Sequence, residues 1–342
     1  MCSYYAVREH ARPDPAVSIP WKALVPVAAL AAFIIALVVL HRVLAAYNYH
    51  ELWHDLRAIS LPCLAAALVL TAIDYWALTA YDALSLTAIG GQLAYPKVAA
   101  TAFMAFSCSH NLGYAVISGG AIRWRYYISY GLNPAQIAGI TILGGISYIF
   151  GFVVIAALTS LAWPPAAAAS WLSHGETRAV GAGALMLVLG LVAALLSRRR
   201  PWRWREWTLP APQVRTTLVL LVVGCLDWVL AACVVWVLLP NLGDLGFVQF
   251  VGIFILAGAA GNLSQVPGGL GVLEASLLVM LSGRASVGAL AGALLAFRAI
   301  YYLLPLVTAL GLMGVIEAVR HSRKPRPGLL ALSDGPNPGS PA

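Results

Sequence analysis

Two apolar stretches, each interrupted near its centre, decide the fold of this chain. Ser109–Arg125 reads SHNLGYAVISGGAIRWR, and Gly261–Glu274 reads GNLSQVPGGLGVLE. Each contains an Asn-Leu pair and then a Gly-Gly pair, and the flanking apolar segments are too short to cross a bilayer alone. Lipid cannot satisfy the backbone groups of such a break, so the break must line a cavity or pack within protein. We therefore predict that Val98–Leu132 and Phe247–Leu281 form re-entrant pairs of broken helices.

The composition of the whole chain is that of a membrane protein. Of 342 residues, 61% are hydrophobic and 10% are charged, whereas soluble domains average about 45–50% and about 25%. The mean hydropathy is +0.83. A soluble protein this apolar could not cover its core with polar surface, but a bilayer solvates an apolar exterior. We predict an all-α, polytopic integral membrane protein.

Apolar runs outside the two broken regions supply the full spans. A spanning helix needs about 20 apolar residues. The runs of this length are Trp21–Val43, Leu61–Tyr81, Gln136–Trp163, Arg178–Ser197, Arg215–Leu239 and the longer Ser286–Val319. Pro305 should kink the last run, whose length leaves one crossing or two open. The predicted fold therefore has about six full spans and two re-entrant hairpins.

The two halves of the chain carry similar signals in the same order. In each half an Asp within an apolar run, Asp74 or Asp227, is followed by an aromatic residue and later by a broken region. If both broken regions are re-entrant, residues 61–163 and 215–319 cross the membrane in opposite directions, as in inverted-repeat transporters. If residues 98–119 instead span fully, the N-terminus lies outside. We favour the inverted repeat.

The net charge of +8 is concentrated beside apolar runs. Basic residues gather within residues 198–215 and 320–326. Such clusters indicate a cytoplasmic side and attract anionic lipid heads, whereas no basic, aromatic-bearing soluble module suggests nucleic-acid binding. We predict cytoplasmic N- and C-termini, with residues 1–20 as a cytoplasmic segment, 21–319 as the transmembrane domain and 320–342 as a disordered tail.

One motif of soluble enzymes is present in a short connector. His50–His54 reads HELWH, which on a helix places two histidines one turn apart to bind Zn²⁺, with Glu51 as general base. A catalytic site also needs a third protein ligand. No downstream motif supplies one, and the five cysteines lack CxxC spacing. We interpret the segment as an interfacial connector and expect no catalytic residue, metal or cofactor; an intramembrane zinc protease is the alternative.

Ionisable residues in or beside apolar runs are the stronger functional signal, because each costs at least ~2.5 kcal/mol at the bilayer centre. Those within the runs are Asp74, Asp227, Glu274 and Arg298, and those at run edges are Asp82, Arg123 and Arg125. Internal ion pairs that hold helices together are one interpretation. We favour the other, a polar cavity for a charged substrate, because several of these residues lie beside the glycine-rich breaks.

Four segments together resemble a known family. They are Tyr81–Leu84 (YDAL), Ser109–Leu132, Val266–Glu274 (VPGGLGVLE) and Phe297–Pro305 (FRAIYYLLP). The residues of these segments and their order resemble the transmembrane domain of bacterial lysylphosphatidylglycerol synthase/flippases, the multiple peptide resistance factors. The resemblance implies a domain of the bacterial inner membrane that moves aminoacylated phosphatidylglycerol between leaflets and so repels cationic peptides. No synthase domain follows in this sequence, so we expect a stand-alone member that is not an enzyme.

The resemblance also implies which residues meet the lipid. The polar positions of the family's motifs fall on Asp82, Arg123, Glu274 and Arg298. We expect a head group between the two broken regions, with Arg123, Arg125 and Arg298 near its phosphate, and with the acidic residues holding these arginines or meeting a cationic head. The complete candidate set is Asp82, Asn111, Ser118, Gly119, Gly120, Arg123, Arg125, Asn262, Pro267, Gly268, Gly269, Glu274, Arg298 and Tyr302.

Our leading hypothesis is a translocator of a phospholipid or an aminoacylated phospholipid. No P-loop motif for ATP is visible, so movement would be downhill or ion-coupled. A non-transporting membrane partner of a separate lipid-modifying enzyme is the rival. The expected partners are phospholipids and the membrane, not nucleic acid. The sequence leaves both a monomer and a homo-oligomer as alternatives.

Two geometric expectations follow from the re-entrant topology. The pairs Gly119–Gly120 and Gly268–Gly269 should sit where helices break, because glycine permits positive φ and close backbone approach. Asp82 and Arg123 should lie on the same, cytoplasmic side and interact, because an arginine beside a cavity is best stabilised by a carboxylate.

Overall fold

The structure is a computed structural model that describes residues 57–112, 115–163, 173–197, 202–204, 207–209, 213–264 and 266–322. Its regular elements are helical, apart from two short antiparallel strands, β1 (Trp202–Trp204) and β2 (Trp207–Leu209). The predicted first span, Trp21–Val43, and the HELWH motif lie outside the described residues. So do residues 1–20 and most of the C-terminal tail.

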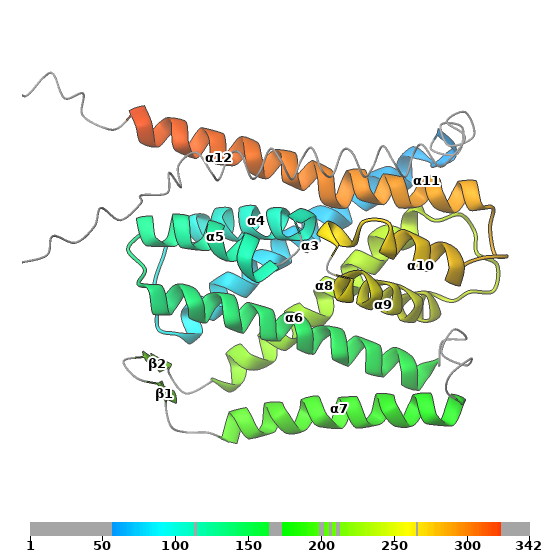
Figure 1. Cartoon of the computed structure of the whole chain (residues 1–342), viewed down its shortest axis with the longest axis horizontal. Helices are drawn as coiled ribbons and strands as arrows, with labels where there is room; N and C mark the ends of the chain where they lie inside the picture. Colours follow the sequence, from blue (N-terminus) through cyan, green and yellow to red (C-terminus); the bar gives the residue numbers. More distant parts are fainter. Residues whose placement is uncertain are drawn as a thin grey trace, which may run out of the picture.

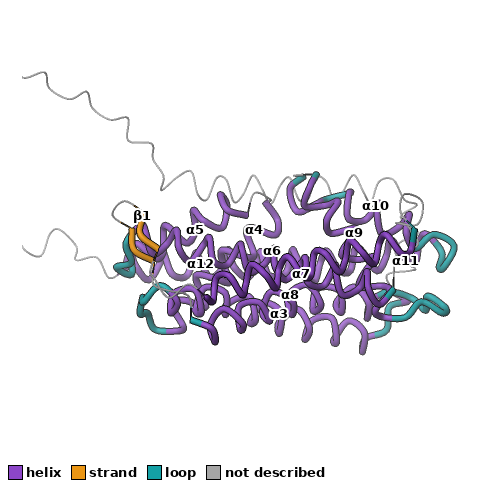
Figure 2. Tube along the Cα trace, turned by 90° about the horizontal axis from the view of Figure 1, so that it is seen from below, coloured by secondary structure: helices purple, strands orange, loops and turns teal. Residues whose placement is uncertain are grey.

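Five helices are long and apolar enough to cross a membrane. They are α3 (Leu61–Ala88), α6 (Pro134–Ala162), α7 (His174–Ser197), α8 (Val214–Leu238) and the rod Val287–Arg320. They coincide with five of the six predicted spans. In Figure 2 the helices form one layered bundle whose loops gather at its two ends. This arrangement confirms an all-α, polytopic membrane protein.

The final apolar run is one continuous rod and therefore a single span. It consists of α11 (Val287–Phe297), a π-helical turn η3 (Arg298–Leu303) and α12 (Leu304–Ser322), drawn orange to red in Figure 1. Pro305 has no N–H, so the carbonyl of Tyr301 loses its α-helical partner. That carbonyl accepts a hydrogen bond from the Tyr75 hydroxyl at 3.1 Å instead. A π-turn therefore stands where the sequence predicted a kink.

The two broken regions are helical hairpins. The first pairs α4 (Tyr95–Leu112) with α5 (Ala115–Ser129). The second pairs α9 (Phe247–Leu263) with α10 (Val272–Met280) through a short 3₁₀ turn, η2 (Pro267–Gly269). In Figure 1 the first hairpin reaches inward from one end of the bundle and the second from the other, and their tips meet at the middle. This is the re-entrant arrangement that the sequence predicts.

The glycine pairs of the two hairpins differ in conformation. Gly268 and Gly269 have φ values of 61° and 60°, so they sit at a helix break as predicted. The prediction is wrong for Gly119 and Gly120, which lie inside α5, after the break between Leu112 and Ala115. A Cβ atom on Gly119 would collide with the Ser109 side chain of α4. Gly119 is therefore needed for close helix packing and not for a turn.

Glycines also bring the long helices together. A Cβ atom on Gly151 of α6 would overlap the backbone of Gly224 in α8, and one on Gly224 would overlap the backbone of α6. Small residues at such crossings let membrane helices approach closely. α7 packs on the outer face of α6 and leaves most of its apolar side chains exposed, among them Met186 at 69% and Leu187 at 62%. In a membrane these side chains would face lipid.

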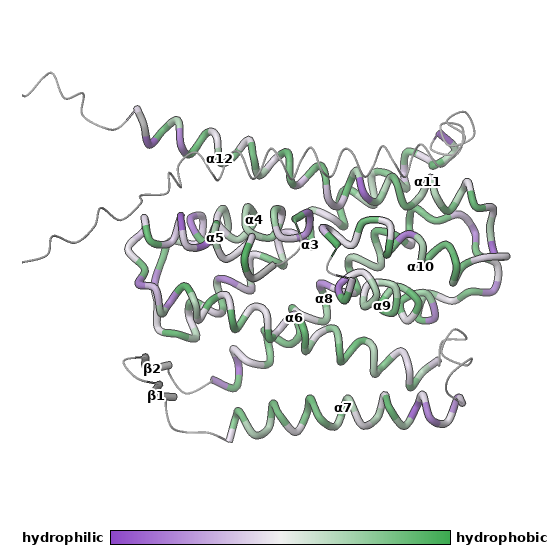
Figure 3. Tube along the Cα trace, in the orientation of Figure 1, coloured by the Kyte–Doolittle hydropathy of each residue, from purple (hydrophilic) through white to green (hydrophobic). Residues whose placement is uncertain are grey.

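The hydropathy of the helices differs between their central parts and their ends (Figure 3). Figure 3 shows apolar residues along most of the helices, with polar residues at helix ends and near the hairpin tips. Residues 61–163 contain a span, a hairpin and a span, and residues 215–319 contain the same order of elements. Their origin as inverted repeats, the domain boundaries and the side on which each terminus lies stay predictions.

Candidate functional site

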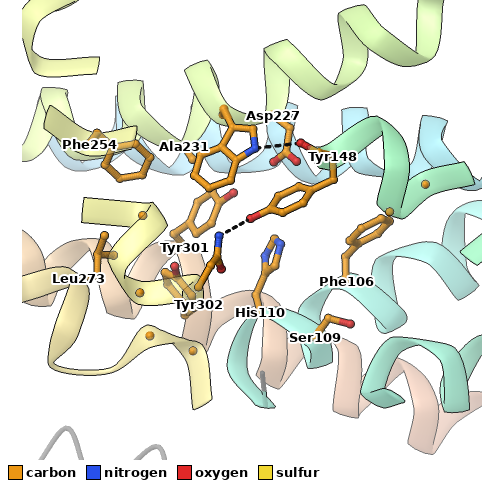
Figure 4. A pocket seen from close by; sticks show the side chains of 18 of the residues that line it. Phe106, Ser109, His110, Tyr148, Asp227, Ala231, Phe254, Leu273, Tyr301 and Tyr302 are labelled. Atoms are coloured by element: carbon orange, nitrogen blue, oxygen red, sulfur yellow. Dashed lines mark hydrogen bonds between the residues drawn. The ribbon is translucent and has the colours of Figure 1, made fainter. Parts of the chain in front are cut away.

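A cavity of about 340 Å³ lies where the two hairpin tips meet. It is lined from both hairpins and from α6, α8 and η3, so segments far apart in sequence share it (Figure 4). The tips are in close contact, since a Cβ atom on Gly268 would lie 3.1 Å from the His110 carbonyl oxygen and 3.3 Å from that of Asn111. The volume falls within the range of small-ligand sites, about 300–1,000 Å³.

Aromatic side chains form much of the cavity wall. Tyr148 packs on Trp228, with ring centroids 5.1 Å apart. The His110 ring stacks on Tyr301, with centroids 5.9 Å apart and an interplanar angle of 14°. Figure 4 shows Tyr148, His110 and Phe106 around the same space. Such a wall can hold an apolar body and also a cation against the ring faces.

A buried ion pair closes one side of the cavity. Arg123 of α5 donates from Nε and Nη2 to the carboxylate of Asp82 in α3, at distances from 2.8 to 3.1 Å. Tyr127 donates to the same carboxylate at 2.7 Å. The Arg123 guanidinium lies 4.7 Å from the centroid of the Phe106 ring, and Arg123 is one of the lining residues. The structure thus confirms the predicted interaction between Asp82 and Arg123.

A second buried ion pair holds the broken turn of the other hairpin. Arg298 donates from Nε to Glu274 and from Nη1 to the Gly268 carbonyl at 2.6 Å. A third bond, at 3.3 Å, joins Nη2 to the Gly269 carbonyl. Glu274 also accepts from the Gly271 amide at 2.8 Å. Arg298 therefore satisfies backbone groups that lipid could not satisfy, and it shapes the cavity through the glycines that line it.

Arg125 lies away from the cavity, contrary to its expected place near a phosphate. Its Nη2 atom is 2.8 Å from Glu317 of α12, and both side chains are about 30% exposed. Arg320 lies 3.8 Å from the same carboxylate. These charges form a surface network at the end of the bundle where α5 and α12 finish. Arg125 is therefore not among the residues that line the cavity.

The remaining candidates divide into two groups. Asn262, Gly268, Gly269 and Tyr302 line the cavity, whereas Ser118, Gly119, Gly120 and Pro267 are not among the lining residues. Asn262 donates to the Tyr148 hydroxyl at 3.1 Å. Asn111 stays behind the wall, where it donates to the Ser107 carbonyl at 2.8 Å and to the Tyr302 carbonyl at 3.1 Å.

Several lining residues are absent from the predicted site. His110 immediately precedes Asn111 in the first broken region, so its position offered a usable signal. Asp227 stands out as an intramembrane acid but lacks a neighbouring glycine-rich break in sequence. Tyr148 carries no sequence signal, because it lies within an ordinary apolar span.

Two buried carboxylates contrast with the ion-paired ones. Asp74 and Asp227 are 0% and 3% exposed. Tyr301 donates its hydroxyl to Asp74, and Tyr81 donates to Asp227 at 3.1 Å. Oδ1 of Asp74 has no hydrogen-bond partner in the described part of the chain. No arginine or lysine there pairs with either carboxylate.

The described residues contain no group of three or more His, Cys, Asp or Glu side chains that could hold a metal ion. The HELWH histidines, His50 and His54, lie outside these residues. The expectation that the protein uses no metal or cofactor therefore stays a prediction.

Known proteins with similar sequences share this membrane region. Residues 27–309 match the family described as the lysylphosphatidylglycerol synthase TM region. Protein slr0712 of Synechocystis is 30% identical over 296 residues, which cover 86% of this chain and 92% of that protein. The inner membrane protein YbhN of Escherichia coli is 28% identical over 282 residues, which cover 81% of this chain and 88% of YbhN.

A longer relative matches through the same region. The phosphatidylglycerol lysyltransferase of Staphylococcus aureus strain MRSA252 is 24% identical over 307 residues. The match covers 82% of this chain but 33% of that protein. This chain therefore corresponds to about a third of that longer protein.

Proposed function

The chain belongs to the family of the lysylphosphatidylglycerol synthase transmembrane region, and from this membership we propose that it is a lipid translocator. It moves a phospholipid, or an aminoacylated phospholipid, between the leaflets of a bacterial inner membrane without covalent change. Similarity to an inner membrane protein of E. coli supports the location. Similarity to phosphatidylglycerol lysyltransferases supports a lipid of that class. The resemblance of the motifs to the multiple peptide resistance factors supports a role in resistance to cationic peptides.

The cavity between the hairpin tips is the observation that carries this proposal. A phospholipid can cross a bilayer only if its polar head is shielded from the acyl chains. Here a cavity of about 340 Å³ lies midway along a bundle whose outer surface is apolar. The head group would occupy the cavity while its acyl chains stay in the surrounding lipid.

Arg123 is the residue that we expect to meet the phosphate. It uses Nε and Nη2 for Asp82, and no acceptor in the described part of the chain is paired with Nη1. A guanidinium held by one carboxylate can still donate its remaining N–H groups to a phosphate oxygen. Arg298 instead acts indirectly, because its three nitrogens already bind Glu274 and the two glycine carbonyls.

Reconstitution into liposomes tests the proposal. Wild-type protein should equilibrate a labelled phospholipid between leaflets faster than protein-free liposomes do. Arg123→Ala should slow this movement by about 10- to 100-fold, because a charge-assisted hydrogen bond contributes about 1.5–3 kcal/mol. Arg125→Ala is the matched control, since Arg125 lies two positions away in α5 but pairs with Glu317 outside the cavity. Its rate should equal that of wild type.

The lipid panel should contain phosphatidylglycerol, phosphatidylethanolamine and lysyl-phosphatidylglycerol. The exchange variant Asp82→Arg with Arg123→Asp should insert and recover part of the movement, because the buried pair is restored with its order reversed. If wild-type protein moves none of these lipids but co-purifies with a lipid-modifying enzyme, the rival function as a membrane partner is correct. Equal rates for wild type and Arg123→Ala would also contradict the proposed site.

A further inference from the structure

Two acidic side chains lie buried inside the bundle. Asp74 lies on α3 and Asp227 on α8, and these two helices pack along much of their length. The side chains are 0% and 3% exposed, and Asp74 accepts a hydrogen bond from Tyr301, a residue of the cavity wall. Asp227 lines the cavity, whereas Asp74 is not among its lining residues.

The surroundings of this pair contain no neutralising cation in the described part of the chain. The titratable side chains that face it are Tyr75 and Tyr81 from α3, His110 from α4, Tyr148 from α6, and Tyr301 and Tyr302 from η3. The buried arginines of the described part pair with other carboxylates, Arg123 with Asp82 and Arg298 with Glu274. The pair therefore differs from the other buried carboxylates of the bundle.

Two negative charges are unfavourable in such surroundings. Burial disfavours the charged form of each group, and the neighbouring like charge disfavours it further. One bound proton removes the repulsion and leaves a single buried negative charge, which the tyrosine hydroxyls stabilise by hydrogen bonds. A calcium or magnesium ion would need about six or more oxygen ligands. The neighbouring oxygens identified here belong to tyrosine hydroxyls that donate to the carboxylates, which suits a proton better than a metal.

We propose that Asp74 and Asp227 together bind one proton, and that release of this proton is coupled to entry of a head-group amine into the cavity. The coupling rests on the lipid translocation proposed above. A cationic amine beside Asp227 would take the place of the proton as the balancing charge, and the proton would leave to water. Protons and the amine-bearing lipid would then move in opposite directions, so a proton gradient would drive the lipid.

The proton site can be tested without transport. Infrared difference spectra of the purified protein, recorded between acidic and alkaline pH, should show the carbonyl band of a protonated carboxyl. The band should be lost or shifted in Asp74→Asn and in Asp227→Asn, because the two residues share the proton. Asn retains an oxygen that can accept from Tyr301 or Tyr81, and a monodisperse elution profile would verify folding. Asp244→Asn, in an exposed loop, should keep the band. Absence of the band in wild type, or its survival in both variants, would overturn the proposal.

Coupling is tested in proteoliposomes that contain labelled phosphatidylethanolamine and carry an imposed pH gradient. Wild-type protein and Asp244→Asn should shift the leaflet ratio of the label by up to about tenfold per pH unit, and the shift should reverse with the gradient. Asp227→Asn should give a ratio independent of the gradient.

The two experiments separate the two proposals. If wild-type protein moves lipid but ignores the gradient, or follows a sodium gradient instead, coupling to protons is wrong and translocation stands. If no lipid moves while the infrared band behaves as expected, translocation is wrong and the proton site stands.

Discussion

The two hairpins share a sequence pattern but use it for different physical purposes. In the α4–α5 hairpin the helix breaks after Leu112, and Gly119 lies inside α5, where the absence of a side chain lets α4 come close. In the α9–α10 hairpin the glycines themselves form the break, with positive φ at Gly268, Gly269 and Gly271. Gly119 therefore serves helix packing, whereas Gly268 and Gly269 serve a turn, and the Gly-Gly pattern alone does not tell which of the two applies.

The two hairpins also differ in which partner of the buried ion pair they carry. The first hairpin carries an arginine, Arg123, and receives a carboxylate from α3; the second carries a carboxylate, Glu274, and receives an arginine from η3. Arg298 also binds two carbonyls of the turn, whereas Arg123 binds none. The second hairpin thus depends on its neighbour for both charge balance and backbone satisfaction.

Arg298→Ala should therefore cause the largest loss of stability. It would leave Glu274 and the Gly268 and Gly269 carbonyls without their donor, and breaking a buried pair costs about 3–5 kcal/mol. Thermal unfolding in detergent measures the effect, with Arg125→Ala as the control, since exposed pairs contribute about 0–1 kcal/mol. Arg298→Lys should fall between the two because lysine lacks the fork geometry. If Arg298→Ala and Arg125→Ala had equal unfolding midpoints, the second hairpin would not depend on Arg298 for its stability.

Arg123→Ala should destabilise the protein less than Arg298→Ala, toward the lower end of the same ~3–5 kcal/mol. Asp82 would keep the hydrogen bond from Tyr127, and no backbone carbonyl would lose a donor. The double variant Arg123→Ala with Tyr127→Phe should approach the loss seen for Arg298→Ala. Equal midpoints for the single and double variants would show that Tyr127 does not stabilise the isolated carboxylate.

Gly268→Ala should cost about 1–2 kcal/mol, because its φ of 61° is strained for any residue with a Cβ atom. The new methyl group would also lie 3.1 Å from the His110 carbonyl at the other hairpin tip. The measurement is the unfolding midpoint, together with the rate of lipid movement. A midpoint equal to that of wild type would mean that the turn can adopt another conformation.

Gly120→Ala should have the smallest effect and the opposite sign. No atom lies within 4 Å of the position that its Cβ would occupy, and it sits in the interior of α5. Alanine in a helix interior is more stable than glycine by about 0.5–1 kcal/mol. A modest rise of the unfolding midpoint is expected, and a fall would indicate that Gly120 is needed at a break, as the sequence pattern suggested.

Much of the fold could be predicted because run length and hydropathy report directly on a bilayer. Five spans, both hairpins and the pairing of Asp82 with Arg123 follow from such arguments. It could not be predicted that Arg123 lines the cavity whereas Arg125 pairs with Glu317 outside it. Residues two apart on a helix point to nearly opposite faces, and nothing in the apolar sequence of α5 tells which face looks inward. The binding of Arg298 to carbonyls about 30 residues away likewise depends on how separate helices are rotated.

The π-turn η3 changes the direction in which the side chains of the last span point around the helix axis. Successive residues of an α-helix advance by about 100° around its axis, so one widened turn rotates everything that follows it. Before the turn α11 packs on α8, and after it α12 packs on α4 through Leu306 and Ala309. η3 therefore sets the rotation of α12 relative to α11, so that one rod packs on both halves of the bundle. Deletion of a single residue within Arg298–Leu303 would rotate α12 by roughly a quarter turn and present a different face to the first hairpin.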